Sequence, residues 1–221
     1  MAETLVRLDA CAALKKLRSL LRTRSARTLV GVDGVLGSGK ADFADTLGGL
    51  LTECGIPVVR ISMKDFLFPK AVREELGDRT GRGYYENSFN LAAFMEDVIE
   101  PLRPDGSGRY LLRYYDGDAE CDCPHKWAIA PDDSVVIVDG MFLHRREFTE
   151  TRKVWNYSVW LEVPFDEAFG RLALSNGFDP DPYAESNSRF LDAQRLYLER
   201  CDPAAHADFV VENTAPLGPV D

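Results

Sequence analysis

The chain has 221 residues, a length that fits one domain or at most two small ones. Hydrophobic residues make up 45% of it and charged residues 28%, which is ordinary for a soluble globular domain. The formal net charge is -10, and a field of that sign disfavours nonspecific attraction to nucleic acid or to an anionic membrane. An anionic ligand would therefore need a local basic site.

The cysteines and apolar segments bear on where the protein works. Five cysteines at irregular spacing, with no secretory signal at the N-terminus, favour reduced thiols and a cytoplasmic location. No apolar run approaches the roughly 20 residues that cross a bilayer. Together with the negative net charge, this predicts that neither a membrane nor a nucleic acid is a partner.

The predicted elements alternate between helix and strand along the chain. An amphipathic helix is expected over residues 3–23, packed on the domain or, alternatively, lying on a membrane. Short apolar runs predict strands at residues 28–33, 57–62, 109–115, 134–139, 157–163 and 208–212. Helices are expected at residues 40–53, 91–102, 164–174 and 189–200, with a loop at 178–188. This alternation predicts one α/β domain over residues 1–221, with a mostly parallel sheet sandwiched by helices and ligands at the carboxyl ends of its strands.

A glycine-rich motif lies between the first sheet strand and the helix after it. Residues 34–40 match G-x-x-x-x-G-K in the strand, loop and helix context that this motif requires. The glycines let backbone N–H groups surround a phosphate, and the dipole of the following helix adds to the attraction. The predicted nucleotide-binding residues are Gly34, Val35, Leu36, Gly37, Ser38, Gly39, Lys40 and Ala41. Lys40 would supply a cation to the outer phosphates during catalysis.

The position after the lysine departs from the motif. It should hold Ser or Thr, whose hydroxyl coordinates magnesium, and here it is Ala41. The remaining metal candidates are Ser38 and Asp139, which ends the most apolar strand, although Asp139 could instead be a capping or turn residue. Binding of a nucleotide–magnesium complex should therefore be weaker than in a standard loop.

With these motifs in place, the chain resembles the uridine kinase and phosphoribulokinase family of P-loop kinases, most closely its bacterial uridine kinase-like members. The resemblance covers residues 28–213, and its pieces include GVDGVLGSGK (31–40), SMKDF (62–66), GRGYYENSF (81–89), YYDGD (114–118) and VVIVDGMFLHRREF (135–148). It implies a P-loop NTPase-type fold with a small lid segment at about residues 175–190. It also implies ATP and Mg as cofactors, a nucleoside-like acceptor whose hydroxyl is phosphorylated, and it leaves a homo-oligomer open.

The resemblance also implies roles for single residues. Lys64 stands where the family has the aspartate that accepts the hydroxyl proton, and a lysine cation cannot readily do this. Asp65 is the alternative base, although neighbouring side chains of an extended strand point opposite ways. Substrate contacts are implied for Tyr85, Asn90, Asp116 and Arg189, with core packing as the alternative for Tyr85. The lid arginine of the family is replaced by Ser175, and Arg171, one helical turn earlier, is the remaining phosphate contact.

Three functions remain open from the sequence. The first is an active ATP-dependent small-molecule kinase, the second a catalytically impaired nucleotide-binding protein, and the third a repurposed enzyme acting on a phosphorylated substrate. Ala41 and Lys64 favour the last two, whereas Lys40 and Asp139 favour nucleotide binding in all three. A C-x-C-x-H run at residues 121–125 would contact the substrate or, alternatively, bind a metal.

Overall fold

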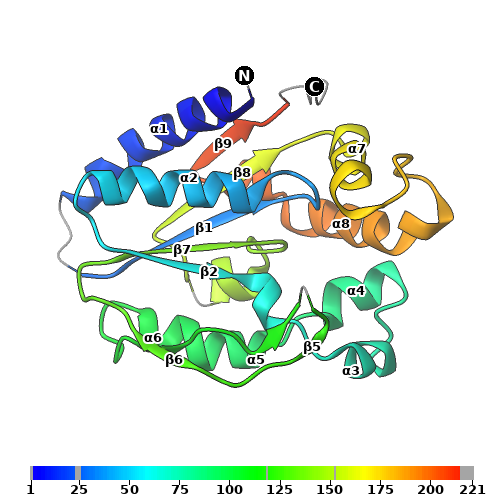
Figure 1. The fold of residues 1–221 in the computed structure, drawn as a ribbon, viewed down its shortest axis with the longest axis horizontal. Coiled ribbons are helices and arrows are strands. Elements are labelled where there is room, and N and C mark those ends of the chain that lie inside the picture. Colours follow the sequence, from blue (N-terminus) through cyan, green and yellow to red (C-terminus); the bar gives the residue numbers. More distant parts are fainter. Residues whose placement is uncertain (1, 23–25, 118, 152, 215–221) are drawn as a thin grey trace.

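A parallel sheet of five strands forms the centre of the computed structural model, which describes residues 2–22, 26–117, 119–151 and 153–214 (Figure 1). The strand order is β2 (Val58–Ser62), β7 (Val135–Gly140), β1 (Thr28–Gly34), β8 (Tyr157–Glu162) and β9 (Phe209–Glu212). All neighbouring pairs are parallel, and β1 and β7 are buried along their whole length. Burial on both faces explains their nearly continuous apolar sequences. The predicted α/β fold with a parallel sheet is therefore confirmed.

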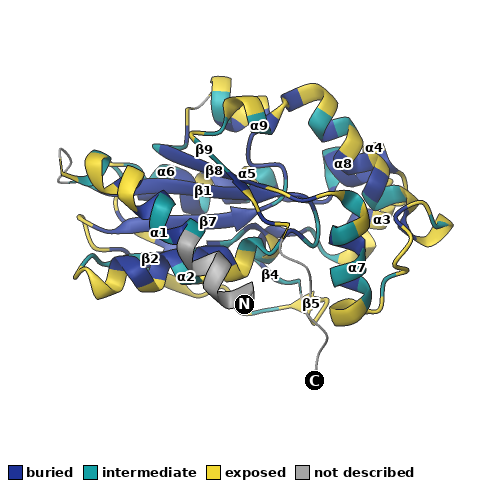
Figure 2. Ribbon diagram, turned by 90° about the horizontal axis from the view of Figure 1, so that it is seen from above, coloured by how far each residue is buried: buried dark blue, intermediate teal, exposed yellow. Residues whose placement is uncertain are grey.

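Helices cover both faces of this sheet, so its strands are buried between them (Figure 2). On one face, α1 (Ala2–Leu21) lies against α2 (Lys40–Glu53), and their buried side chains form one hydrophobic cluster with Val30 and Val32 of β1. Side chains alternate between the two faces along a strand, so Leu29, next to Val30, belongs to the hydrophobic cluster of the opposite face. No helix among the described residues is long and apolar enough to span a membrane.

The second face carries shorter helical segments. They are the 3-10 helix Met63–Phe66, α3 (Lys70–Glu75), α4 (Gly81–Asn87), α5 (Leu91–Phe94), the π-helical turn Met95–Ile99, α6 (Glu100–Leu102) and the π-helical turn Glu147–Thr151. The C-terminal part adds α7 (Phe165–Asn176), the 3-10 helix Glu185–Asn187, α8 (Ser188–Cys201) and α9 (Pro203–His206). Helices α3 and α4 were not predicted, because segments of 6 and 7 residues hold too few turns to show an apolar period.

The expected strand at residues 109–115 is wrong as a single element of the sheet. It is divided between β3 (Arg109–Leu111), which pairs antiparallel with β6 (Trp127–Ile129), and β4 (Tyr115–Asp116), which pairs with β5 (Cys121–Asp122). Between the two, the N–H of Tyr114 donates to the backbone carbonyl of Asp65 at 2.9 Å instead of to a strand. This bond draws the β4–β5 hairpin against the 3-10 helix that follows β2.

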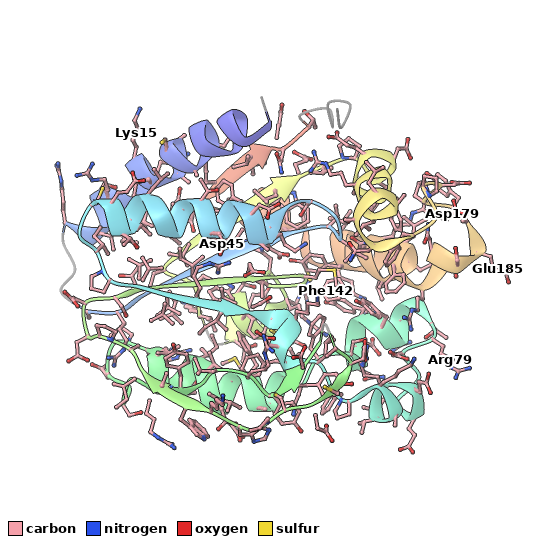
Figure 3. All side chains as sticks on the ribbon, viewed as in Figure 1. Lys15, Asp45, Arg79, Phe142, Asp179 and Glu185 are labelled. Atoms are coloured by element: carbon pink, nitrogen blue, oxygen red, sulfur yellow. The ribbon has the colours of Figure 1, made fainter. Side chains whose placement is uncertain are left out.

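The segment expected to act as a lid connects α7 to α8. Helix α7 ends at Asn176, and Gly177 follows with a φ of 70°, the left-handed conformation common after helix C-termini. Asp179 and Glu185 lie at the outer end of this connection in Figure 3, away from the sheet. Tyr183 is 65% exposed there, so a large aromatic side chain stands on the surface of the segment.

Candidate active site

The glycine-rich loop joins the carboxyl end of β1 to the start of α2, at the sheet edge where a ligand is expected (Figure 1). Gly37 and Gly39 have φ angles of 81° and 82°, which glycine adopts without steric cost. A Cβ atom on Gly37 would lie 2.4 Å from the carbonyl oxygen of Ala168, so the loop packs directly on α7. The first N–H groups of α2 lack helical partners and face this loop. Backbone geometry and helix dipole thus suit a phosphate group.

Lys40 lies across the loop that precedes it. Its Nζ atom donates to the carbonyl oxygen of Val35 at 2.7 Å and lies 3.4 Å from the hydroxyl of Ser38. Burial lowers the pKa of Lys40 to about 8, although the carboxylates of Asp33 and Asp139 act in the opposite direction. The lysine is thus mostly charged at pH 7, with a charge that is lost as the pH rises through 8.

Two side chains from the C-terminal third of the chain hold the loop backbone. The N–H of Leu36 donates to the Oε1 atom of Gln194 on α8, and the Nδ2 atom of Asn213 donates to the Ser38 carbonyl oxygen at 2.8 Å. Ser38 itself is fully buried. The phosphate loop is therefore fixed by contacts that neither its own sequence nor its spacing indicates.

Arg171, the predicted phosphate contact, lies close to this support. Its Nη2 atom donates to the backbone carbonyl of Asn213 at 2.6 Å and pairs with Glu167 one turn earlier on α7. Ser175, at the position of the lost lid arginine, donates its hydroxyl hydrogen to the Arg171 carbonyl oxygen at 3.0 Å. Arg171 thus contacts the loop indirectly, through Asn213.

A buried carboxylate stands at the start of the loop. Asp33 accepts hydrogen bonds from the N–H of Gly34 at 2.7 Å, from the N–H of His144 at 3.1 Å and from the Tyr197 hydroxyl. Its Oδ2 atom also lies 2.9 Å from Nδ1 of His144, and all three side chains are almost completely buried. Burial and the carboxylate of Asp33 raise the pKa of Tyr197 well above its ordinary value, so the hydroxyl keeps its proton and donates it.

Asp139, the metal candidate, lies at the carboxyl end of β7 and is already paired. Its Oδ1 atom is 2.9 Å from Nη2 of Arg60, and its Oδ2 atom accepts the Ser62 hydroxyl at 3.1 Å. Arg60 also pairs with Asp45 on α2 at 2.9 Å. Because Ala41 has no oxygen, the donors suited to magnesium are few, and Asp139 can reach a metal only by sharing its carboxylate with Arg60 or through water.

The residues around the expected base lie on a 3-10 helix, not on the extended end of β2. Successive side chains of such a helix are about 120° apart, so the argument that Lys64 and Asp65 point opposite ways is wrong. Lys64 is exposed, whereas Asp65 is half-buried and pairs with Nε of Arg113 at 2.8 Å. Arg113 also pairs with Asp116 at 2.8 Å. It thus brings together two predicted residues that are far apart in sequence.

Tyr85 lies in the hydrophobic core, the alternative to a substrate contact. Its ring centroid is 5.0 Å from that of Phe142, and the guanidinium of Arg145 covers the ring at 4.2 Å. The hydroxyl lies 3.5 Å from Sγ of Cys201. Tyr85 and Arg200 also line a cavity of about 820 Å³ whose lining includes no residue of the phosphate loop. The position of Tyr85 does not support the predicted contact.

Three other predicted features have structural contacts. Asn90 accepts a hydrogen bond from the N–H of Ala93 at 3.1 Å and so caps α5, a role that competes with sugar binding. Arg189 lies on the first turn of α8 and covers the rings of its neighbours Tyr84 and Phe190. In the C-x-C-x-H run, His125 packs beside the ring of Tyr114, and no described group of three or more His, Cys, Asp or Glu could hold a metal ion.

Sequence comparison gives kinases as relatives. No family model matches the chain. The mouse nicotinamide riboside kinase 1 is 25% identical over 156 residues, which cover 71% of this chain and 70% of that protein. The human nicotinamide riboside kinase 1 is 24% identical over 155 residues, covering 69% of this chain and 67% of that one.

Solved structures share the fold across most of the chain. A possible uridine kinase from Bacillus stearothermophilus superimposes with a TM-score of 0.67 at 24% identity, covering 89% of this chain and all of that one. D-glycerate 3-kinase from Cryptococcus neoformans gives a TM-score of 0.64 at 14% identity and covers 96% of this chain and 97% of that one. The kinase relatives in sequence and the shared fold confirm that the chain resembles the P-loop kinases of the uridine kinase type.

Proposed function

We propose that the protein is an ATP-dependent kinase that phosphorylates a hydroxyl group of a nucleoside-like small molecule. The observation that carries this proposal is the glycine-rich loop with its left-handed Gly37 and Gly39, closed by Lys40, beside the carboxylate of Asp139. The kinase relatives in sequence supply the reaction class. A cytoplasmic location and self-association remain predictions.

The chain's own residues would divide the work in the following way. Bound ATP would provide the phosphoryl group, and Mg²⁺ would neutralise its phosphate charge. The backbone N–H groups of Gly34, Leu36 and Ser38 already donate within the protein. Those of Gly37, Gly39 and Lys40 would hold the outer phosphates, and the Lys40 side chain would place a cation on the transferring group. Asp139 would orient the water shell of the metal, since Arg60 already occupies one of its oxygens.

The acceptor hydroxyl needs a group that takes its proton. Asp65 supports this role because it is a half-buried carboxylate held by Arg113, next to the hairpin that carries Asp116. Phosphoryl transfer depends mainly on positioning and charge neutralisation and needs little base strength, so a carboxylate paired with arginine is sufficient. In this proposal Asp65 replaces the family aspartate, whose position holds Lys64.

A nucleotide-binding protein without transferase activity is the second candidate. The pairing of Asp139 with Arg60, together with Ala41, favours it because both features weaken the metal site. One experiment separates the two functions: ATP affinity is measured by calorimetry with and without magnesium, and phosphate transfer is then assayed on uridine and nicotinamide riboside. Transfer to either acceptor supports the kinase. ATP binding that ignores magnesium, with no transfer, would select the second candidate.

A further inference from the structure

A buried cluster of charges joins four parts of the second face, and the phosphate chemistry does not use it. Arg73 of α3 is 5% exposed and Asp78, in the turn before α4, is 2% exposed. Nη1 of Arg73 lies 3.9 Å from Oδ2 of Asp78, and Nη1 of Arg189 on α8 lies 3.7 Å from the same oxygen. Glu120, from the β4–β5 hairpin, completes the cluster through its contact with Nη2 of Arg73.

The hydrogen-bonding capacity of the cluster is not used up. Both distances to Asp78 exceed a normal hydrogen bond, and Nε of Arg73 and Oδ1 of Asp78 are buried without a hydrogen-bond partner among the described residues. An arginine has five donors in a planar fork that matches a carboxylate or a phosphate. Two arginines sharing one buried carboxylate thus leave one positive charge and several donors for a further anion.

Glu120 supplies that anion in this structure, and it comes from the surface. Its side chain is 43% exposed, whereas that of Arg73 is almost completely buried. The backbone of Glu120 has a φ of 52°, a left-handed conformation that is unfavourable for a residue other than glycine. A carboxylate is therefore already bound at this position, where the Tyr115 hydroxyl also donates to it at 3.3 Å.

Two elements connect the cluster to the candidate active site. Arg189 lies on the same helix as Gln194, which holds the phosphate loop at Leu36. The hairpin that carries Glu120 also carries Asp116, which Arg113 joins to Asp65. Helix α8 therefore connects the two arginines to the phosphate loop, and the β4–β5 hairpin connects them to the proposed base.

We propose that the acceptor carries an anionic group, a carboxylate or a phosphate ester, at the end remote from its reacting hydroxyl. Arg73 and Arg189 bind this group, and it displaces the carboxylate of Glu120. Charge-assisted bidentate contacts of this kind are strong and geometrically selective. This inference rests on the proposed kinase function, because it defines the class of acceptor.

The test compares acceptors that differ only in the anion. Binding to the protein with ADP is measured by calorimetry for nicotinamide riboside against nicotinic acid riboside, and for uridine against uridine 3′-monophosphate. A carboxylate site gives at least about tenfold tighter binding of the acid in the first pair, and a phosphate site gives this in the second. Equal or weaker binding of the anionic member in both pairs would overturn the inference.

Variants assign the preference to the cluster. In Arg189→Met the preference for the anionic member should fall to within threefold. Arg79→Met is the matched control, because Arg79 is next to Asp78 in sequence but its side chain is 76% exposed and points outward (Figure 3). Glu120→Gln should tighten binding of the anionic member about threefold or more by removing its competitor. A preference that survives Arg189→Met would contradict the proposal.

The binding readout also separates this inference from the kinase proposal. Transfer to a neutral acceptor without any anion preference would reject the anion site and leave the kinase function standing. The opposite outcome is a protein that transfers phosphate to none of the four compounds but shows an anion preference that Arg189→Met removes. It would reject the kinase function and still support the anion site. Thermal unfolding of each variant checks that the fold is intact.

Discussion

Arg60 holds the carboxylate of Asp139 with its Nη2 atom 2.9 Å from Oδ1, so the residue expected to serve magnesium is already paired with a cation. The arginine also contacts Asp45, and its Nη1 atom donates to the carbonyl oxygen of Ile137 at 3.0 Å. A cation here partly replaces the charge that a metal would bring. Ala41 and Arg60 therefore act in the same direction, since both weaken magnesium binding at this end of the loop.

Arg60→Gln tests this relationship. We expect the ATP affinity of the variant to depend more steeply on magnesium than that of the parent, because Oδ1 of Asp139 is released to bind the metal or its water. The measurement is the ATP dissociation constant without magnesium divided by that with magnesium, a ratio which should rise at least about threefold, or roughly 0.6 kcal/mol. Arg82→Gln, at an exposed arginine on α4, is the control. An unchanged ratio in Arg60→Gln would mean that Asp139 does not serve the metal.

The elements around the phosphate loop could be predicted because their signals are local. Strand β1, the loop and α2 follow one another in sequence, and the apolar run of β7 needs no partner to be identified. The pairing of Arg60 with Asp139 gives no such signal, because it depends on β2 lying beside β7. Ser62 and Asp139 are register partners although they are 77 residues apart. Only the strand order brings them together.

The buried support of the loop was missed for the same reason. Asp33 was seen as the last residue of a strand, and its partners His144 and Tyr197 follow 111 and 164 residues later. The short 3-10 helix at Met63–Phe66 was mistaken for extended chain, because four residues give no period to count. Contacts made by the tertiary fold, not weak local patterns, account for most of what the sequence could not indicate.

Lys40 should bind ATP in a pH-dependent way. Its pKa of about 8 lies below the ordinary 10.5, so the side chain loses its charge as the pH rises through 8. We expect ATP affinity to fall by up to about tenfold between pH 7 and pH 9, since only about a tenth of the lysine stays protonated at pH 9. Lys40→Met should bind ATP at least about tenfold more weakly at pH 7, the loss expected for one charged contact.

The same pKa fixes the direction of a stability effect. Between pH 8 and pH 10.5 the unfolded chain holds a proton on Lys40 that the folded chain has released. The contribution of this group to the free energy of unfolding therefore rises with pH across that window.

A parent and a Lys40→Met variant whose ATP affinities show the same pH profile would contradict the assignment of Lys40 to the phosphates.

Tyr197→Phe should destabilise the protein through the loop support. Removing the hydroxyl takes one donor from the buried carboxylate of Asp33 and one acceptor from the N–H of His144. Both groups keep other partners, so the loss is that of a hydrogen bond to a charged group, about 1.5–3 kcal/mol of the free energy of unfolding, measured by urea denaturation. Tyr183→Phe, at a tyrosine 65% exposed, should change it by less than about 0.5 kcal/mol. Equal stability of the two variants would show that the hydrogen bond from Tyr197 to Asp33 does not contribute to the free energy of unfolding.

Asp65→Asn separates proton transfer from nucleotide binding. Asparagine has nearly the same shape and can still contact Arg113, but it cannot accept the proton of the acceptor hydroxyl. We expect the rate of transfer to fall by about a hundredfold, the lower end of what a general base contributes, because phosphoryl transfer needs little base strength. ATP affinity should stay within twofold, since the contacts of the loop with the phosphates are untouched.

The control for this substitution is Asp105→Asn, at an exposed aspartate in the turn after α6, which should leave both quantities unchanged. Transfer rates come from a coupled assay of ADP release with the best acceptor of the panel. If Asp65→Asn keeps the parent rate, the proton acceptor lies elsewhere. In that case Lys64→Asp becomes the informative variant, because it restores a carboxylate at the position where the resembling kinases have one, and a rise in rate would identify that position as the site of the base.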